Sequence, residues 1–391
     1  MFTNQSNTAT STININNRSS FVSQIFTIAL FLTMFVFAAP SEAFAQNRSN
    51  REVPSRRTPA DDNEYKVLVN PLSPDDPRAK LDPALENVPA IPRPIYGPAS
   101  AENDPEARAT VEFNLKTGEM NNRRWNPIKT PTFVESLIDA GNAMLPGSRG
   151  ANLQQDNIDA QTRGQRSESV IGNDDRQKVT NTAAYPWRAM VKLYPRFPNG
   201  VTYNCSGTLV DAKYVLTAGH CIYNRSAGGW ATSVQVIPGL NGTYQPYGAT
   251  WATLMRTYTA WTNNSSADHD FALLTLAAPI GSSTGWLGMK VYSDMDGRFG
   301  NLAGYPADRD NATGMYYHFG SMLSSTANRV FHQIDTFGGH SGSGIYHIEA
   351  GPHRYIFAVH TNGNEGDNQN KGCRLDSGKF SSILSWIATG N

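Results

Sequence analysis

The chain has no surplus of either charge, because its 391 residues include 33 Lys and Arg and 33 Asp and Glu. A protein whose main partner is nucleic acid carries a basic surplus for the phosphates, so this balance argues against that class. Cysteine is scarce as well: three are too few for a scaffold built from disulfides, and no pair has the spacing of a zinc site. With 39% hydrophobic residues, the chain can nevertheless form a folded core.

The first 45 residues contain an apolar run, Ile25–Ala39, that only two threonines interrupt. As a helix this run would span ~22 Å, less than the ~30 Å hydrocarbon core of a membrane. The small-x-small pattern Ala43–Ala45 follows it. We therefore expect 1–45 to be a secretory signal peptide cut after Ala45, with a retained signal anchor as the alternative. The rest of the chain is then secreted, without stable membrane association after signal removal, into a compartment where disulfides persist.

Residues 46–168 differ in composition from the rest of the chain. They hold 14 of the 23 prolines and only five aromatic residues. Proline-rich stretches favour extended conformations, and so few large apolar groups cannot offset much chain entropy. We expect a Pro-rich propeptide or linker that is largely disordered and has little core of its own.

Residues 169–391 carry 28 of the 40 aromatic residues, all three cysteines and all eight histidines. Short runs typical of β-strands recur there between turn clusters, at Trp187–Leu193, Val201–Val210, Tyr214–Thr217, Val234–Ile237, Phe271–Leu276, Gly344–Ile348 and Tyr355–His360. In Lys379–Ala388, apolar residues are spaced as on one face of a helix. The pattern predicts an all-β domain that ends in a C-terminal helix.

Three stretches of this domain offer a base, an acid and a hydroxyl in the order His220, Asp270, Ser341. A serine hydroxyl is a weak nucleophile until a nearby base takes its proton, and a histidine can pass that proton to the leaving amine. Asp270 would hold the imidazole in the required tautomer. The glycines around Ser341 allow a tight turn, so that the Gly339 and Ser341 N–H groups can stabilise one oxyanion.

The stretches Thr217–Cys221, Asp270–Leu274 and Gly339–Ser343 resemble the catalytic blocks of chymotrypsin-fold serine proteases. A closer resemblance, to secreted bacterial glutamyl endopeptidases, rests on Ser169–Arg176, Val179–Thr182, Asp335–Ser343 and Ala358–Gly363. It covers 169–391 and none of 46–168. It implies two perpendicular antiparallel β-barrels with the triad in the cleft between them, hydrolysis of protein or peptide substrates, and no cofactor. The residues support no metal site.

The resemblance also implies finer roles. Family position favours Asp270 over Asp268, which lies two residues away. It implies a disulfide between Cys205 and Cys221 that holds the histidine loop and stabilises the fold by ~3 kcal/mol. Cys373 is then expected to be a buried free thiol.

His360 matches the family's pocket histidine, and Thr336 matches its pocket hydroxyl residue. An imidazole beside a hydroxyl can donate charge-assisted bonds to a carboxylate, so we expect cleavage after Glu. Asp335 lies six residues before Ser341, where trypsin-like enzymes carry the acid that selects Arg and Lys. Trypsin-like cleavage therefore stays open as an alternative.

The residue before the nucleophile is His340, so the carboxylate that pairs with a new N-terminus in trypsin is missing. Glu168 directly precedes the family-like start at Ser169. We expect a precursor, cleaved after Glu168 by itself or by a like enzyme, that acts as a monomer with its own propeptide as a partner. A non-catalytic secreted binding protein on the same scaffold is the alternative from a different class.

Overall fold

The computed structural model describes residues 70–97, 104–124, 170–349, 353–363 and 366–390. They all belong to the second of the two units into which the chain divides, Asn63–Asn391; the first, Met1–Asp62, lies outside the described residues. The predicted signal peptide with Ala45, and the predicted processing site at Glu168 and Ser169, lie outside them too. Among the described helices, none is both long and apolar enough to cross a membrane.

The first half of the protease domain is a closed barrel of six antiparallel strands. They are β4 (Met190–Arg196), β5 (Cys205–Asp211), β6 (Tyr214–Thr217), β9 (Ser233–Pro238), β10 (Thr250–Tyr258) and β11 (Ala272–Leu276). Neighbours follow the order β11-β6-β5-β4-β9-β10, and pairing of β10 with β11 closes the barrel. Apolar side chains such as Val215 and Leu273 are fully buried in its core, which drives strand association.

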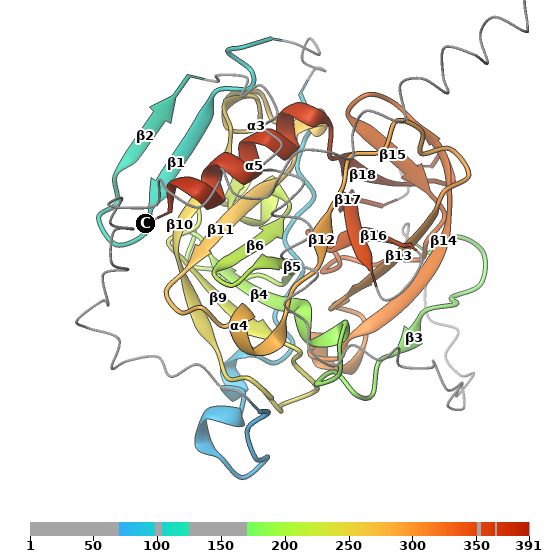
Figure 1. The fold of residues 1–391 in the computed structure, drawn as a ribbon. Helices are drawn as coiled ribbons and strands as arrows, with labels where there is room; N and C mark the ends of the chain where they lie inside the picture. Colours follow the sequence, from blue (N-terminus) through green and yellow to red (C-terminus); the bar gives the residue numbers. More distant parts are fainter. Residues whose placement is uncertain (1–69, 98–103, 125–169, 350–352, 364–365, 391) are drawn as a thin grey trace, which may run out of the picture. The chain divides into compact units, whose positions relative to one another are not determined.

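The second half is another closed antiparallel barrel. Its strands are β13 (Phe299–Gly304), β14 (Tyr316–Ser325), β15 (Arg329–His332), β16 (Gly344–Ile348), β17 (Arg354–Asn362) and β18 (Asn370–Arg374). The order is β17-β16-β13-β14-β15-β18, closed by pairing of β17 with β18; β3 (Gln177–Lys178) joins β14, and β12 (Gly288–Met289) joins β17. Figure 1 shows the first barrel in green and yellow and the second in orange and red. The predicted all-β, two-barrel fold is confirmed.

Short elements connect the strands. The small strands β7 (Tyr223–Asn224) and β8 (Gly229–Trp230) form a ribbon. The helices are α3 (Thr259–Asn264), α4 (Gly281–Thr284), η1 (Pro77–Ala79), η2 (Pro83–Leu85), η3 (Trp187–Ala189), η4 (Gly219–Cys221), η5 (Arg225–Ala227), η6 (Ala267–His269) and η7 (Asp310–Ala312).

The C-terminal helix α5 (Ser377–Thr389) confirms the helix predicted over 379–388. Asp376 caps it by accepting hydrogen bonds from the N–H groups of Gly378 and Lys379. On its buried face, Trp386 stacks on Phe271 of the first barrel, with ring centroids 5.8 Å apart. The last helix therefore closes the core of the first barrel.

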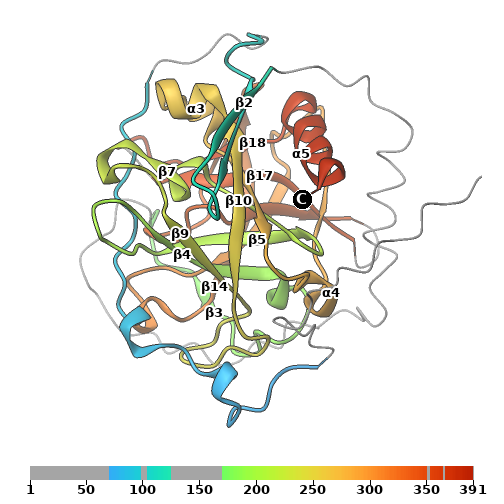
Figure 2. The ribbon, with the colours of Figure 1, turned by 90° about the vertical axis from the view of Figure 1, so that its left-hand side faces the viewer.

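The pro-segment is built into the protease domain where the structure describes it. Strands β1 (Thr110–Asn114) and β2 (Met120–Arg123) form a hairpin that pairs with β10, as Figure 2 shows at the edge of the first barrel. Upstream, Leu81, Val88 and Ile91 are buried in the core that the barrels form. The expectation of a largely disordered segment is wrong for 70–97 and 104–124: these stretches form defined elements and bury apolar side chains against the protease domain, which composition did not predict.

Candidate active site

Strand pairing in the first barrel brings His220 and Asp270 together. His220 lies in η4, the short helix that follows β6, and Asp270 lies two residues before β11, the neighbour of β6. The Asp270 carboxylate accepts two hydrogen bonds from His220, from the backbone N–H at 2.9 Å and from Nδ1 at 2.8 Å. Both residues are buried. Two bonds to one carboxylate fix the imidazole with its proton on Nδ1 and leave Nε2 as an acceptor. Asp268 is half-buried, and its backbone carbonyl accepts a hydrogen bond from Cys373 Sγ; among the described residues, no hydrogen bond joins Asp268 to His220.

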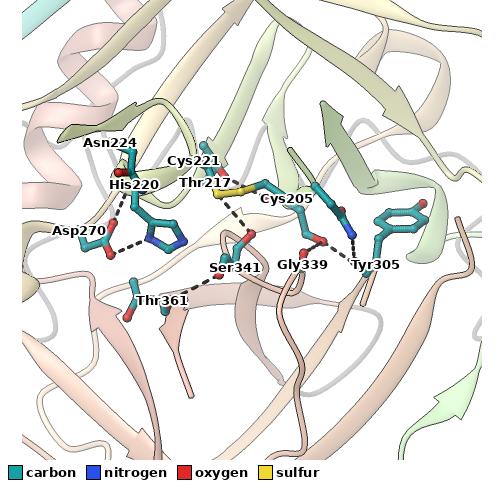
Figure 3. Close-up of a disulfide and its surroundings, with 12 residues drawn as sticks. Cys205, Thr217, His220, Cys221, Asn224, Asp270, Tyr305, Gly339, Ser341 and Thr361 are labelled. Atoms are coloured by element: carbon teal, nitrogen blue, oxygen red, sulfur yellow. Dashed lines mark hydrogen bonds and ion pairs between the residues drawn. A yellow bond between two sulfur atoms is a disulfide. The ribbon is translucent and has the colours of Figure 1, made fainter. Parts of the chain in front are cut away.

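Ser341 lies in the loop before β16, and Figure 3 shows the His220 imidazole between Asp270 and Ser341. The Ser341 carbonyl accepts a hydrogen bond from the Ser206 N–H at 2.8 Å, and its hydroxyl donates to the Thr361 carbonyl at 3.4 Å. The three side chains that the sequence singles out thus meet where the two barrels contribute their loops. Acyl transfer needs these three residue types close together, with the serine hydroxyl turned towards the imidazole; here that hydroxyl bonds to Thr361 instead.

Two glycines permit the tight turn at Ser341. Gly342 has φ +92°, and a Cβ there would lie 2.1 Å from the Ser206 carbonyl oxygen. Gly339 has φ +107°, and a Cβ there would lie 2.4 Å from the Tyr305 carbonyl oxygen. The Ser206 hydroxyl donates a 2.8 Å hydrogen bond to the Gly339 carbonyl oxygen. In the described part of the chain, the N–H groups of Gly339 and Ser341 donate to no protein acceptor, so they are available to an oxyanion.

A disulfide joins Cys205 at the start of β5 to Cys221, directly after His220. Cys373 is a buried free thiol, as expected, and burial raises its pKa to about 12. Its sulfur is therefore a thiol, not a reactive thiolate, near neutral pH.

Two clusters of potential metal donors occur among the described residues, and each includes donors that already have other partners. One combines His220 with Cys205 and Cys221, whose sulfurs are joined to each other. The other combines Asp175, His318 and Asp335. The Asp335 carboxylate already accepts two backbone hydrogen bonds, so this cluster gives no reason to add a metal.

His360 lies on β17 beside the nucleophile loop. Its N–H donates to the Ser343 carbonyl and its carbonyl accepts from the Gly342 N–H, both at 2.8 Å. The imidazole is buried, and its Nδ1 has no hydrogen-bond partner among the described residues. Burial, followed by the neighbouring imidazoles, holds the pKa of His360 well below its usual range, so the ring is neutral. Thr336 is likewise buried with an unpaired hydroxyl.

His332 is a neighbour of His360 that sequence reasoning did not single out. The two rings meet edge to face, with centroids 5.5 Å apart. Burial lowers the pKa of His332 to about 3. The ring Nε2 also lacks a partner among the described residues. The sequence shows that the domain is rich in histidine, but this composition does not predict that His332 contacts His360.

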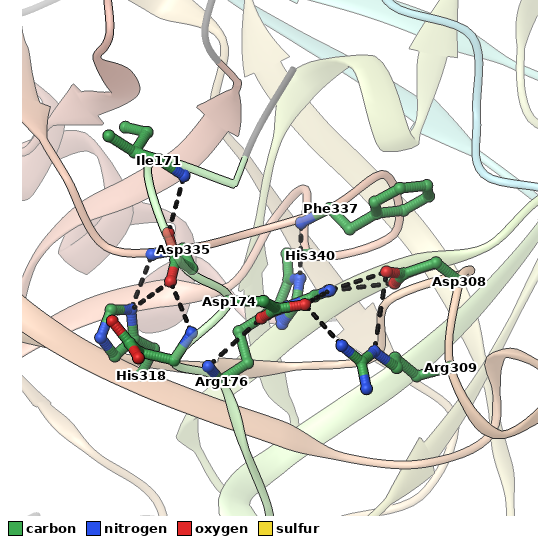
Figure 4. A network of polar contacts seen from close by, with 10 residues as sticks. Ile171, Asp174, Arg176, Asp308, Arg309, His318, Asp335, Phe337 and His340 are labelled. Carbon is green, nitrogen blue, oxygen red and sulfur yellow. Dashed lines mark hydrogen bonds and ion pairs between the residues drawn. The ribbon is translucent and has the colours of Figure 1, made fainter. Parts of the chain in front are cut away.

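The Asp335 carboxylate binds backbone N–H groups at the start of the protease domain. Its carboxylate accepts hydrogen bonds from the N–H groups of Ile171 and Asp175, both at 2.9 Å, and lies 3.6 Å from His318 Nδ1 (Figure 4). The residue is buried, and burial raises its pKa. A carboxylate satisfied in this way does not present a free charge to a bound cation.

His340, the residue before the nucleophile, is buried, and its Nδ1 accepts a hydrogen bond from the Phe337 N–H at 3.1 Å. Burial lowers its pKa to about 3. The neutral ring therefore shapes the nucleophile loop as an acceptor, as Figure 4 shows beside the Asp335 network.

The cavity at Ser341 has a second wall that the sequence did not predict. His220, Ser341 and His360 line it from the protease domain, and Ile91, Arg93 and Pro94 line it from the pro-segment. Nothing in a Pro-rich sequence indicates where it will bind, so these contacts could not be predicted.

Comparison with known proteins agrees with this geometry. The family model named Trypsin matches residues 174–373, about half of the chain. The chain belongs to the trypsin family. A glutamyl endopeptidase of Bacillus licheniformis is 35% identical over 56% of this chain and 69% of its own length. A Bacillus subtilis protein named extracellular metalloprotease is 32% identical over the same shares.

Among solved structures, a Glu endopeptidase in complex with MPD matches with a TM-score of 0.51 and 28% identity. The match covers 56% of this chain and 99% of that structure. This trypsin-family chain is therefore a serine protease with a chymotrypsin-like fold, which acts on peptide or protein substrates. The conclusion confirms the resemblance found in the sequence.

Proposed function

We propose that this trypsin-family protease is secreted as a precursor and hydrolyses peptide bonds after Glu. The observation that carries the proposal is the convergence of the His220–Asp270 pair, Ser341 and the unpaired imidazole of His360 around one cavity. His220, Asp270 and Ser341 would catalyse the hydrolysis, and His360 would bind the acidic side chain of the substrate.

In the proposed mechanism, Ser341 attacks the substrate carbonyl while His220 Nε2 takes its proton. Asp270 keeps the imidazole in the correct orientation and stabilises its positive charge through the 2.8 Å bond to Nδ1. The Gly339 and Ser341 N–H groups stabilise the oxyanion, and His220 then returns the proton to the leaving amine. A water molecule, deprotonated by His220, then attacks the acyl-enzyme in the same way and releases the acyl group from Ser341.

The preference for Glu rests first on His360, which lines the cavity and whose Nδ1 is unpaired among the described residues, and second on Thr336, whose buried hydroxyl is also unpaired although it does not line the cavity. An unpaired polar atom in a protein interior costs free energy, and a substrate carboxylate can satisfy it. His360 can donate one hydrogen bond when neutral and a charge-assisted bond when protonated, and Thr336 offers a hydroxyl. The similarity to the Bacillus licheniformis glutamyl endopeptidase supports the same substrate class.

The rival preference, for Arg or Lys, needs a free carboxylate at Asp335. Both oxygens of that carboxylate accept backbone hydrogen bonds from the start of the domain. A buried imidazole at His360 would also be a poor neighbour for a substrate cation. These contacts favour Glu over the trypsin-like alternative.

The test is a panel of peptides that differ only in the residue before the cut: Glu, Gln, Asp, Arg and Phe. We expect the highest kcat/KM for Glu and a lower value for Asp. A preference for Arg, or equal rates for Glu and Phe, would refute the proposed pocket.

Processing belongs to the same proposal: cleavage after Glu168 would create the N-terminus of the mature enzyme at Ser169, and the enzyme would act as a monomer once the pro-segment has left it. N-terminal sequencing of the secreted product tests it. A start far from Ser169 would exclude processing by the enzyme's own specificity.

A further inference from the structure

We propose that residues 89–97 of the pro-segment are an intramolecular inhibitor that occupies the active-site cleft, with Tyr96 as its anchor. The proposal rests on the proposed function, because it takes Ser341, His220 and Asp270 to be the catalytic groups. It adds to that function a specific occupant of the cleft and a specific means of holding it there.

Backbone contacts hold the segment at both ends, next to the elements that carry the triad. The Pro89 carbonyl accepts a hydrogen bond from the Asn204 N–H at 2.7 Å, one residue before the disulfide-bonded Cys205. At the other end, the Gly97 N–H donates to the Ser265 carbonyl at 3.0 Å, shortly before Asp270. The chain between these two points must therefore pass the catalytic groups.

Between its ends the segment narrows the space at the nucleophile. The cavity that Ile91, Arg93 and Pro94 line together with Ser341 and His360 has a volume of about 30 Å³. That is room for roughly two water molecules, and far less than a peptide substrate with its side chain needs. His220 is only 1% exposed with the segment in place. Ser341 itself stays half-buried, not fully covered, but a peptide substrate cannot lie along this part of the cleft while Ile91, Arg93 and Pro94 occupy its wall.

Tyr96 is held in a site of its own. Its hydroxyl donates a hydrogen bond to Asp270 Oδ2 at 2.9 Å, the oxygen that also accepts from His220 Nδ1. The ring packs edge-on against Trp261, with centroids 6.1 Å apart, and the Arg329 guanidinium lies 6.0 Å from the ring centroid. An aromatic residue seated in this way is a typical energetic anchor of an interface.

The bond to Asp270 also affects the chemistry. Burial raises the pKa of Tyr96 well above its usual value, so the hydroxyl stays protonated and donates at any pH where the enzyme works. A second donor on the same carboxylate oxygen neutralises part of the charge that would otherwise stabilise the protonated imidazole. The segment therefore both narrows the cleft beside the nucleophile and weakens its base.

The composition of the segment protects it from the enzyme it covers. Residues 89–97 contain three prolines and no Glu or Asp. A protease that cuts after Glu finds no suitable bond there. The segment can therefore remain in the cleft as a ligand that is not consumed.

Cleavage after Glu168 would leave the inhibitor bound. The β1–β2 hairpin holds the pro-segment on β10 through backbone pairing and through the buried ion pair between Glu112 and Arg256, whose atoms lie 3.0 Å apart. Arg108 adds a 2.8 Å ion pair with Asp376 at the start of α5. None of these contacts depends on the chain being continuous at Glu168. We expect the cut protein to be a non-covalent, inactive complex until the segment is released or destroyed.

The experiment measures how fast a fluorophosphonate probe labels Ser341 in the full-length precursor and in three variants. Tyr96→Phe removes only the hydroxyl, and Tyr96→Ala also removes the ring. Ile95→Ala is the matched control, because Ile95 is 92% exposed and contacts nothing that the argument uses. Thermal melting of each variant shows that it is folded.

By fully processed enzyme we mean the protein from which the pro-segment has been both cut and removed. We expect the fluorophosphonate to label the precursor at least a hundredfold more slowly than this enzyme. Loss of a hydrogen bond to a charged group predicts an acceleration of roughly tenfold or more for Tyr96→Phe, and a larger one for Tyr96→Ala. Ile95→Ala should stay within twofold of the parent precursor. After cleavage at Glu168, the two fragments should co-elute in gel filtration and remain inactive.

The outcomes separate the two proposals. If the fully processed enzyme does not label at Ser341, the proposed function fails, since no inhibitor is then present. If it labels but the parent precursor labels equally fast, the inhibitor proposal is overturned. Equal acceleration by Ile95→Ala and Tyr96→Ala would overturn the role of Tyr96 as the anchor.

Discussion

Replacing His360 by leucine removes the imidazole that we expect to receive the substrate carboxylate, while it keeps a buried side chain of similar size. A hydrogen bond to a charged group contributes about 1.5–3 kcal/mol, and one between neutral groups about 0.5–1.5 kcal/mol. The variant should therefore lose roughly ten- to hundredfold in kcat/KM for a Glu peptide. For the matching Gln peptide we expect a loss of about tenfold at most.

The assay compares these two peptides on the parent enzyme, His360→Leu and a control, His347→Leu. His347 is a half-buried histidine on β16, and its Nδ1 lies 2.8 Å from the Phe299 carbonyl oxygen. The control should leave the preference for Glu over Gln unchanged. Equal losses for the two peptides in His360→Leu would refute our reasoning, because they would mean that His360 supports the fold and not the substrate charge.

The same pocket predicts a pH dependence with a definite sign. Burial holds the pKa of free His360 well below its usual range, and a bound carboxylate would raise it. Between these two pKa values, binding of a Glu peptide takes up a proton, so its KM should rise as pH rises. The KM of the Gln peptide should stay flat over that range. Parallel KM profiles for the two peptides would contradict a carboxylate–imidazole contact.

Three further substitutions test other contacts. Asp270→Asn should lower kcat by ~10⁴-fold with little change in KM, because the 2.8 Å bond that sets the His220 tautomer is altered; a loss under tenfold would contradict that role. Glu112→Leu removes the carboxylate partner of buried Arg256, which keeps only its bonds to neutral groups, and should destabilise the precursor by about 3–5 kcal/mol in denaturant unfolding, while the processed enzyme, which lacks residue 112, is unchanged. Asp335→Asn should not reduce cleavage after Arg, since that carboxylate binds backbone N–H groups; a selective loss for Arg peptides would restore the trypsin-like alternative.

Local patterns predicted much of the fold. Tyr214–Thr217 and Gly344–Ile348 are strands with the expected bounds, because each is a short apolar run between turns. Strand β10 was not predicted, since it includes the charged Arg256, which is buried beside Glu112, a residue far earlier in the chain. Strand β14 was missed because exposed and buried residues do not alternate along it.

In the active site, too, local motifs predicted some features, whereas contacts between distant parts of the chain were not predicted. The order of His220, Asp270 and Ser341 follows from short motifs, and the structure brings these three together. The contacts of Asp335 with the start of the domain, and of Tyr96 with Asp270, join residues more than 150 positions apart. Such contacts depend on which surfaces meet after folding, and no local signal in one sequence encodes them.

The most direct test of the central claim is to identify the residue that reacts with a fluorophosphonate in the processed enzyme. Mass spectrometry should place the label on Ser341, and Ser341→Ala should lose both the label and peptidase activity, while a metal chelator should leave both intact. Peptidase activity that survives Ser341→Ala, or that the chelator abolishes, would contradict the account.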